Sequence, residues 1–186
     1  MRVVGGRFKG LSLATPKSHA IRPTSDRLRE AVFNILAHAY DDPVQGARVL
    51  DLCAGTGAMG IEALSRGARS VVFIDVSAEA RALIRRNLEA AGIMALARIS
   101  KRDATHLGPA GAQGNFTLVF LDPPYGQGLA EKALASLARG GWLADGALIV
   151  VEERAGLELK MPAGYIERER RAYGETEIRI LTYEHP

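Results

Sequence analysis

The feature that most constrains this chain is an alternation of short apolar runs and helical segments over residues 47–152. Strands are expected at 48–52, 70–75, 117–122 and 147–152, with a weaker one at 96–101. Helices are expected from the turn after the first strand to residue 66, at 78–91 and at 128–139. Strands that alternate with helices form a mostly parallel sheet with helices on both faces. The sequence therefore predicts a Rossmann-like α/β fold.

Two flanking regions complete the predicted architecture. Residues 1–23 are rich in Gly and Pro and predict a short arm or hairpin, and Thr24 or Ser25 is placed to cap a helix that runs to residue 40. Residues 165–183 read as two strands around Tyr173-Gly174, which predicts an antiparallel hairpin and brings the sheet to seven strands. We expect residues 1–40 to form a basic arm and helix, and residues 41–186 to form the main domain.

Aspartates recur where the predicted strands end. Asp51, Asp75 and Asp122 lie at or near three strand ends, and Asp103 follows the weak strand. In open α/β sheets, ligands bind beyond the carboxyl ends of the strands. A helix cap or a turn would explain any one of these acids, but ordinary surface aspartates rarely produce the whole set. The sequence predicts one ligand site at this edge, complete within residues 47–152.

A glycine-rich turn after the first strand indicates the ligand. Gly55, Gly57 and Gly60 match G-x-G-x-x-G, which alone would also suit a nicotinamide dinucleotide. A dinucleotide places its pyrophosphate at this turn, and the carboxylate of Asp51 is a poor neighbour for that anion. S-adenosylmethionine has no phosphate and carries a sulfonium and an ammonium group, which Asp51 suits. We therefore predict S-adenosylmethionine as the cofactor.

Each acid then has an expected partner on the cofactor. Asp75 is placed to accept hydrogen bonds from the ribose hydroxyls, and Asp103 from the adenine amino group. Cys53 is expected to be a small packed residue of the turn, because it stands beside the glycines and away from the residues expected to contact the base. The candidate cofactor-binding residues are Asp51, Cys53, Ala54, Gly55, Thr56, Gly57, Asp75, Val76, Asp103 and Ala104.

The segment Asp122-Pro123-Pro124-Tyr125 is the most specific motif in the chain. It resembles the [Asn/Asp/Ser]-Pro-Pro-[Tyr/Phe/Trp] motif of methyltransferases that act on planar amino groups. The lone pair of such an amine is delocalised into the ring, so acceptors aimed at its N–H bonds favour the transition state. Asp122 and the Pro123 carbonyl can supply these acceptors, Pro124 stiffens the turn, and Tyr125 offers a ring on which an extruded base can stack. These four are the candidate catalytic residues.

Charge is unevenly distributed along the chain. Residues 1–36 carry seven Lys or Arg against two acids, while the remaining residues carry 17 against 19. A basic arm on a near-neutral body suggests a polyanionic partner, although a solvated surface explains the same charges. The candidate RNA-binding residues are Arg7, Lys9, Arg22, Arg27 and Arg29, and Arg22 can alternatively be an internal support of the arm.

Composition excludes several other classes. The single cysteine cannot form an intrachain disulfide, which fits a reducing cytoplasm. No apolar run approaches the about 18 residues that cross a bilayer. The four histidines are scattered without metal-ligand spacing, so we expect neither a metal nor a membrane partner.

Several segments together resemble the bacterial RsmD family, which methylates the N2 of a guanine in 16S ribosomal RNA. The resemblance rests on the opening at residues 2–10, the block Arg22–Asn34, the turn 51–60, the segment 62–68, residues 122–125 and Tyr173–Thr176. It implies a class I methyltransferase fold and a 16S ribosomal RNA substrate, within a small-subunit particle or an assembly intermediate. We also expect the protein to be monomeric and cytoplasmic.

Other activities stay open on the sequence. An adenine-N6 or cytosine-N4 methyltransferase uses the same motif, but the DNA enzymes usually carry a target-recognition domain for which 186 residues leave no room. A protein-glutamine methyltransferase typically opens its motif with Asn. A nicotinamide oxidoreductase leaves Asp51 and the two prolines without a role. A non-enzymatic RNA-binding assembly factor would need neither the acids nor the motif.

Overall fold

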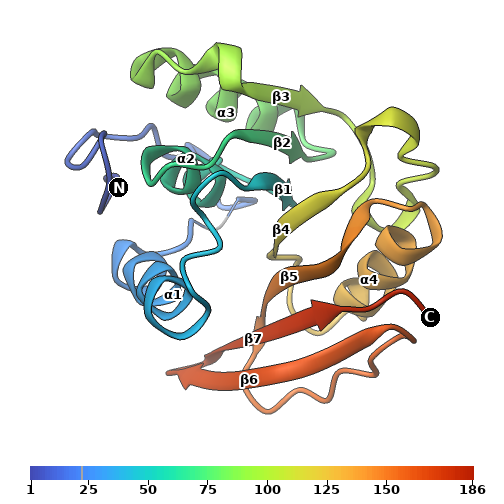
Figure 1. Cartoon of the computed structure of the whole chain (residues 1–186). Helices are drawn as coiled ribbons and strands as arrows, with labels where there is room; N and C mark the ends of the chain where they lie inside the picture. The colour runs from blue at the N-terminus through green and yellow to red at the C-terminus, as the bar shows by residue number, and fades with distance from the viewer. Residues whose placement is uncertain (22) are drawn as a thin grey trace.

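The computed structural model describes residues 1–21 and 23–186 and shows a twisted sheet flanked by helices (Figure 1). The strands are β1 (Arg48–Leu52), β2 (Ser70–Ile74), β3 (Ala97–Ser100), β4 (Phe116–Leu121), β5 (Leu143–Arg154), β6 (Tyr165–Tyr173) and β7 (Thr176–Tyr183). The helices are α1 (Asp26–Ala39), α2 (Ala58–Ser65), α3 (Ala78–Ala91) and α4 (Leu129–Arg139). These bounds confirm the elements predicted from the sequence to within a few residues, except that β5 begins four residues earlier.

The sheet has the order β3-β2-β1-β4-β5-β7-β6. Strands β1 to β5 run parallel, and β7 pairs antiparallel with both β5 and β6, which confirms the predicted Rossmann-like sheet and its C-terminal hairpin. The chain proceeds outward from β1 to β3 and then returns to place β4 on the other side of β1. This reversal creates the crevice between β1 and β4 in which α/β sheets bind ligands.

The two faces of the sheet carry different helices. Strand residues alternate between the faces, so Val49, Phe120 and Val150 pack with α1, α2 and α3 in one core. Their chain neighbours, such as Leu50, pack with α4 in the other core. The odd positions of β1 and the even positions of β4 and β5 therefore face α1 to α3, and this parity decides where the polar residues at the strand ends point.

The helix α1 begins where the sequence predicts. The Ser25 side chain caps it by accepting a hydrogen bond from the Leu28 N–H, and Asp26 in the first turn suits the positive end of the helix dipole. The buried stripe of the helix comprises Arg29, Val32, Phe33, Ile35 and Leu36. An arginine thus occupies a core position of an otherwise apolar face.

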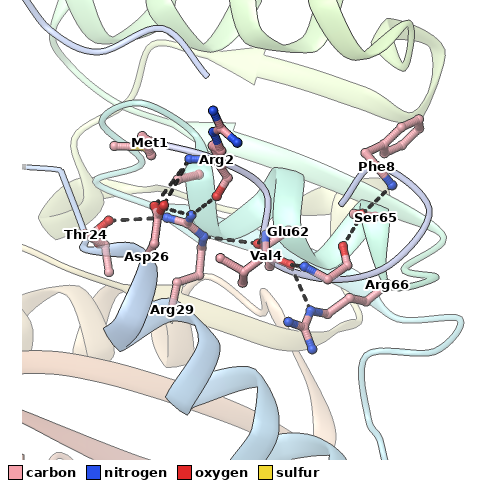
Figure 2. A network of polar contacts seen from close by, with 12 residues as sticks. Met1, Arg2, Val4, Phe8, Thr24, Asp26, Arg29, Glu62, Ser65 and Arg66 are labelled. Atoms are coloured by element: carbon pink, nitrogen blue, oxygen red, sulfur yellow. Dashed lines mark hydrogen bonds and ion pairs between the residues drawn. The ribbon is translucent and has the colours of Figure 1, made fainter. Parts of the chain in front are cut away.

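The N-terminal arm is packed against the main body. Arg2 and Ser12 form an isolated antiparallel bridge, and Val3 and Leu13 are buried in the core that α1 and α2 share. The carboxylate of Glu62 on α2 accepts hydrogen bonds from the backbone N–H groups of Val4 and Gly5, each at 2.9 Å (Figure 2). Residues 1–40 therefore share a hydrophobic core with the main domain.

Candidate active site

The register of the sheet brings the ends of β1, β2 and β4 to one level, and β5 passes beside them and continues to Arg154. In one row, Leu52 lies between Ile74 and Leu121, and Leu121 lies beside Val151. The residues that directly follow this row on β1, β2, β4 and β5 are Cys53, Asp75, Asp122 and Glu152. The sheet topology therefore brings Asp75 and Asp122 to the same edge as the glycine turn, as the sequence predicts. Glu152, which the sequence analysis did not include, lies at the same edge.

The turn after β1 is tight and has little space beneath it. Cys53 has φ 55° and Gly57, at the start of α2, has φ 79°, both in the left-handed region. A Cβ at Gly60 would lie 2.4 Å from the ring of Phe73, so only glycine lets α2 approach β2 this closely. The glycines thus serve the turn and the helix–sheet contact, leaving the backbone of residues 53–57 at the crevice.

Asp51 lies beneath this turn and is only 3% exposed. Its Oδ2 accepts a hydrogen bond from the Gly60 N–H at 3.0 Å. Burial raises its pKa to about 8, and the nearby negative charge of Asp75 adds to the effect. A cation bound in the crevice would favour the ionised carboxylate, which fits the positive charges of S-adenosylmethionine and disfavours a pyrophosphate.

Asp75 joins the turn to the next strand end. One carboxylate oxygen accepts the Gly55 N–H at 2.9 Å, and the other accepts the Ser77 N–H at 2.9 Å. A carboxylate offers about four acceptor positions, so these two bonds orient it and leave capacity for ribose hydroxyls. The adjacent Val76 is 59% exposed, which gives an apolar surface beside the position expected for the nucleoside.

Asp103 caps a short 3-10 turn at Ala104–His106. Its Oδ1 accepts the Thr105 N–H at 2.8 Å and the Thr105 hydroxyl at 2.7 Å, and these bonds lower its pKa. Its side chain is 56% exposed, while Ala104 is buried. Asp103 therefore caps the short turn that follows it, and its contact with adenine stays a prediction.

The setting of Cys53 favours its protonated form. Burial raises its pKa to about 12, and the negative charges of Asp75 and Asp122 add to the shift. Because the thiolate is the reactive form, a protonated Cys53 agrees with the packed role predicted for it.

The candidate catalytic motif, Asp122–Tyr125, follows β4 directly. Asp122 is half-buried, and its Oδ2 accepts a hydrogen bond from the Thr24 hydroxyl at 3.5 Å. Pro123 is buried and Pro124 is exposed. The Tyr125 hydroxyl donates to Glu152 Oε1 at 2.8 Å and lies 2.7 Å from the Thr176 hydroxyl. The orientation of the tyrosine is therefore set by two strands of the C-terminal half.

A groove leads from Asp122 toward α1 and β7. Asp122 and Glu152 line it together with Thr24, and Leu28, Met59 and Ile178 provide apolar walls. Glu152 and Thr24 were not among the predicted site residues. Glu152 carried the same signal as the aspartates, since it directly follows the apolar run at 147–151. Thr24 carried no comparable signal, because it reaches the groove only through the packing of α1.

The arm also contacts the cofactor turn. Asn87 of α3 is 1% exposed; its Oδ1 accepts the Ala14 N–H at 2.6 Å, and its Nδ2 donates to the Thr56 carbonyl at 3.0 Å. Ile21 lies over the turn, with its Cγ2 3.4 Å from where a Cβ at Gly55 would be. The arm therefore packs against the turn of the predicted cofactor site, and the expectation that residues 47–152 can build this site without the arm stays a prediction.

The basic residues predicted to bind RNA separate into two groups. Arg7, Lys9 and Arg27 are exposed and accessible to phosphate. Arg29 is wrongly assigned, because it is 0% exposed: its guanidinium pairs with Glu62 and Asp26 and donates to the carbonyls of Thr24 and Arg2 (Figure 2). Arg22 lies outside the described residues.

Over residues 1–21 and 23–186, no three His, Cys, Asp or Glu side chains are grouped to hold a metal ion. In the same part of the chain, no helix is both long enough and apolar enough to cross a membrane.

Comparisons over the whole chain agree with this geometry. A family model described as "Conserved hypothetical protein 95" matches residues 1–182. Ribosomal RNA small subunit methyltransferase D of Escherichia coli is 35% identical over 185 residues, which span 99% of this chain and 90% of that protein. The chain belongs to the RsmD family. A relative of the same name from Haemophilus influenzae is 31% identical and covers 97% of this chain and 92% of its own length.

A solved structure shows the same architecture. The Escherichia coli protein yhhF superposes with a TM-score of 0.84 at 33% identity, covering 100% of this chain and 99% of the other. Membership of the RsmD family makes this chain a methyltransferase with S-adenosylmethionine as its cofactor, and the buried Asp51 and the orienting bonds on Asp75 fit that molecule.

Proposed function

We propose that this chain transfers a methyl group from S-adenosylmethionine to the exocyclic N2 of a guanine in 16S ribosomal RNA. The observation that carries the proposal is the position of the Asp122–Tyr125 motif, which follows β4 at the crevice beside the glycine turn of β1. The names of the full-length relatives, which are small-subunit ribosomal RNA methyltransferases, support ribosomal RNA as the substrate.

The residues of the motif divide the chemical work. S-adenosylmethionine supplies an electrophilic methyl group when bound. Asp122 accepts a hydrogen bond from the target amine and thereby draws its lone pair out of conjugation with the ring. Thr24, which donates to Asp122 at 3.5 Å, gives up this contact when the amine enters. Holding the amine in line with the methyl group supplies much of the rate, because the reaction is a direct displacement.

Tyr125 positions the base. Its hydroxyl is held between Glu152 and Thr176, so its ring has a fixed orientation beside Asp122. Stacking of one base on an aromatic ring is worth about 1–3 kcal/mol. The exposed Arg7, Lys9 and Arg27 are proposed to hold the RNA through its phosphates, which positions the substrate without specifying its sequence.

The experiment is to digest the ribosomal RNA of a strain lacking the gene and to quantify its methylated nucleosides. N2-methylguanosine should fall by one residue per 16S molecule, and a wild-type copy should restore it. Loss of N6-methyladenosine or N4-methylcytidine instead would refute the choice of base. Naked 16S RNA and small subunits from the deletion strain, methylated side by side, identify the form of the substrate.

The variant Asp122→Ala separates chemistry from cofactor binding. We expect it to lose methyl transfer while calorimetry shows nearly wild-type affinity for S-adenosylmethionine, because the carboxylate acts on the amine. A variant that retains most of the single-turnover rate would contradict the assigned role. If Asp122→Ala restored subunit assembly in the deletion strain as fully as the wild type, the assembly-factor alternative would gain support.

A further inference from the structure

Asp122 and Glu152 occupy neighbouring positions on β4 and β5 and line one groove. β4 and β5 are parallel neighbours and Leu121 pairs with Val151, so the residues that follow are adjacent. The alternation along each strand turns both side chains toward the face covered by α1. Both line the same groove, and Glu152 is only 8% exposed. The proposed amine-binding acid therefore has a second, buried acceptor beside it.

Two adjacent acceptors match one base better than the others. Guanine presents its N2 amine next to the N1–H, which is a second donor. Adenine and cytosine present their amines next to a ring nitrogen that is an acceptor. A carboxylate beside the amine-binding residue would accept the N1–H of guanine. The same carboxylate would repel the lone pair on the ring nitrogen of adenine or cytosine, and binding either base would leave buried polar groups unpaired.

We propose that Glu152 determines base specificity by accepting the N1–H of the target guanine while Asp122 binds its N2 amine. This inference rests on the proposed function. The Tyr125 hydroxyl donates a hydrogen bond to Glu152 Oε1 and also contacts the Thr176 hydroxyl. The bond from Tyr125 orients the Glu152 carboxylate. A carboxylate offers about four acceptor positions, so Glu152 can accept from more than one donor at a time.

The test uses 2-aminopurine, which keeps the N2 amine of guanine and has no hydrogen on N1. Small subunits are reconstituted with 16S RNA ligated to carry either guanine or 2-aminopurine at the target position. The wild type should prefer guanine by about 10- to 100-fold in kcat/KM, as expected for one lost hydrogen bond to a charged group. Equal rates on the two substrates would overturn the proposal without any variant.

Glu152→Gln should shift this preference toward 2-aminopurine. The glutamine amide can donate to the unprotonated N1 while its oxygen still accepts from Tyr125, so the ratio should approach one or invert. Glu153→Gln is the matched control, because Glu153 is buried on the same strand but binds the N–H groups of Gly126 and Arg154. That variant should keep the wild-type ratio.

Two further outcomes separate the explanations. Tyr125→Phe should slow both substrates alike, because it removes the hydroxyl and leaves the carboxylate. If Glu152→Gln also slowed both substrates alike, Glu152 would only support Tyr125 and the inference would be wrong. If the wild type placed no methyl group on guanine N2 at all, the proposed function itself would fail, whatever the behaviour of Glu152.

Discussion

The replacement of Arg29 by alanine tests how the basic N-terminal segment is used. Arg29 and Arg27 stand two positions apart on α1, and sequence reasoning assigned both to RNA. The structure separates them: Arg27 is exposed, whereas Arg29 is buried against Glu62 at 3.1 Å and Asp26 at 2.8 Å. Removing Arg29 leaves the carboxylate of Glu62, itself 0% exposed, without one of its two cationic partners.

The expected magnitude follows from these contacts. Removing one partner of a buried ion pair typically costs about 3–5 kcal/mol, because the remaining charge stays buried. Arg66, which binds the other oxygen of Glu62 at 2.9 Å, offsets part of this loss, so we expect about 2–4 kcal/mol. A surface substitution such as Arg27→Ala typically stays within about 0.5 kcal/mol.

Urea unfolding followed by circular dichroism gives the free energy of unfolding of both variants, and thermal unfolding followed by the same signal gives their Tm. For a chain of this size each kcal/mol corresponds to roughly 2–4 °C in Tm, so Arg29→Ala should melt about 4–16 °C below the wild type and Arg27→Ala at the wild-type temperature. The reasoning is refuted if Arg29→Ala is as stable as Arg27→Ala, or if it binds RNA more weakly while remaining fully stable.

Two further predictions concern the cofactor site and the arm. Burial raises the pKa of Asp51 from 3.8 in the unfolded chain to about 8. Between these pH values the folded protein binds one more proton than the unfolded chain. The free energy of unfolding should therefore fall as pH rises from about 4 to 8, by at most about 1.4 kcal/mol per pH unit. Asp51→Asn should flatten this dependence in urea titrations of the cofactor-free protein and weaken S-adenosylmethionine binding; an unchanged pH profile would show that Asp51 is ionised throughout. Replacing Arg7, Lys9 and Arg27 together by Ala should reduce the salt dependence of RNA binding by roughly 0.7–0.9 in log–log slope per lost contact, without changing cofactor affinity in calorimetry. A triple variant with the wild-type slope would mean that these charges are ordinary solvated surface.

The sequence by itself determined the fold and the edge at which ligands bind. The alternation of apolar runs and helical stripes is a local property, and the carboxyl ends of parallel strands necessarily meet at one edge. The glycine turn, Asp75 and the Asp122–Tyr125 motif therefore could be placed together before any contact was known. Glu152 could have been included on similar grounds, because it directly follows the apolar run at 147–151.

Only the tertiary structure decided which charged residues are buried and which segments touch. Arg29 is spaced three, four and seven residues from Val32, Phe33 and Leu36, so its helical face was readable, but a basic residue on that face is stable only with a buried acid. Its partner, Glu62, lies 33 positions away on α2. The link from Ala14 through Asn87 to the glycine turn, and the position of Ile21 near Gly55, depend in the same way on long-range contacts. Periodicity predicts which side of a helix or strand faces the core. It does not predict which residue lies opposite, because that residue comes from a segment distant in the sequence.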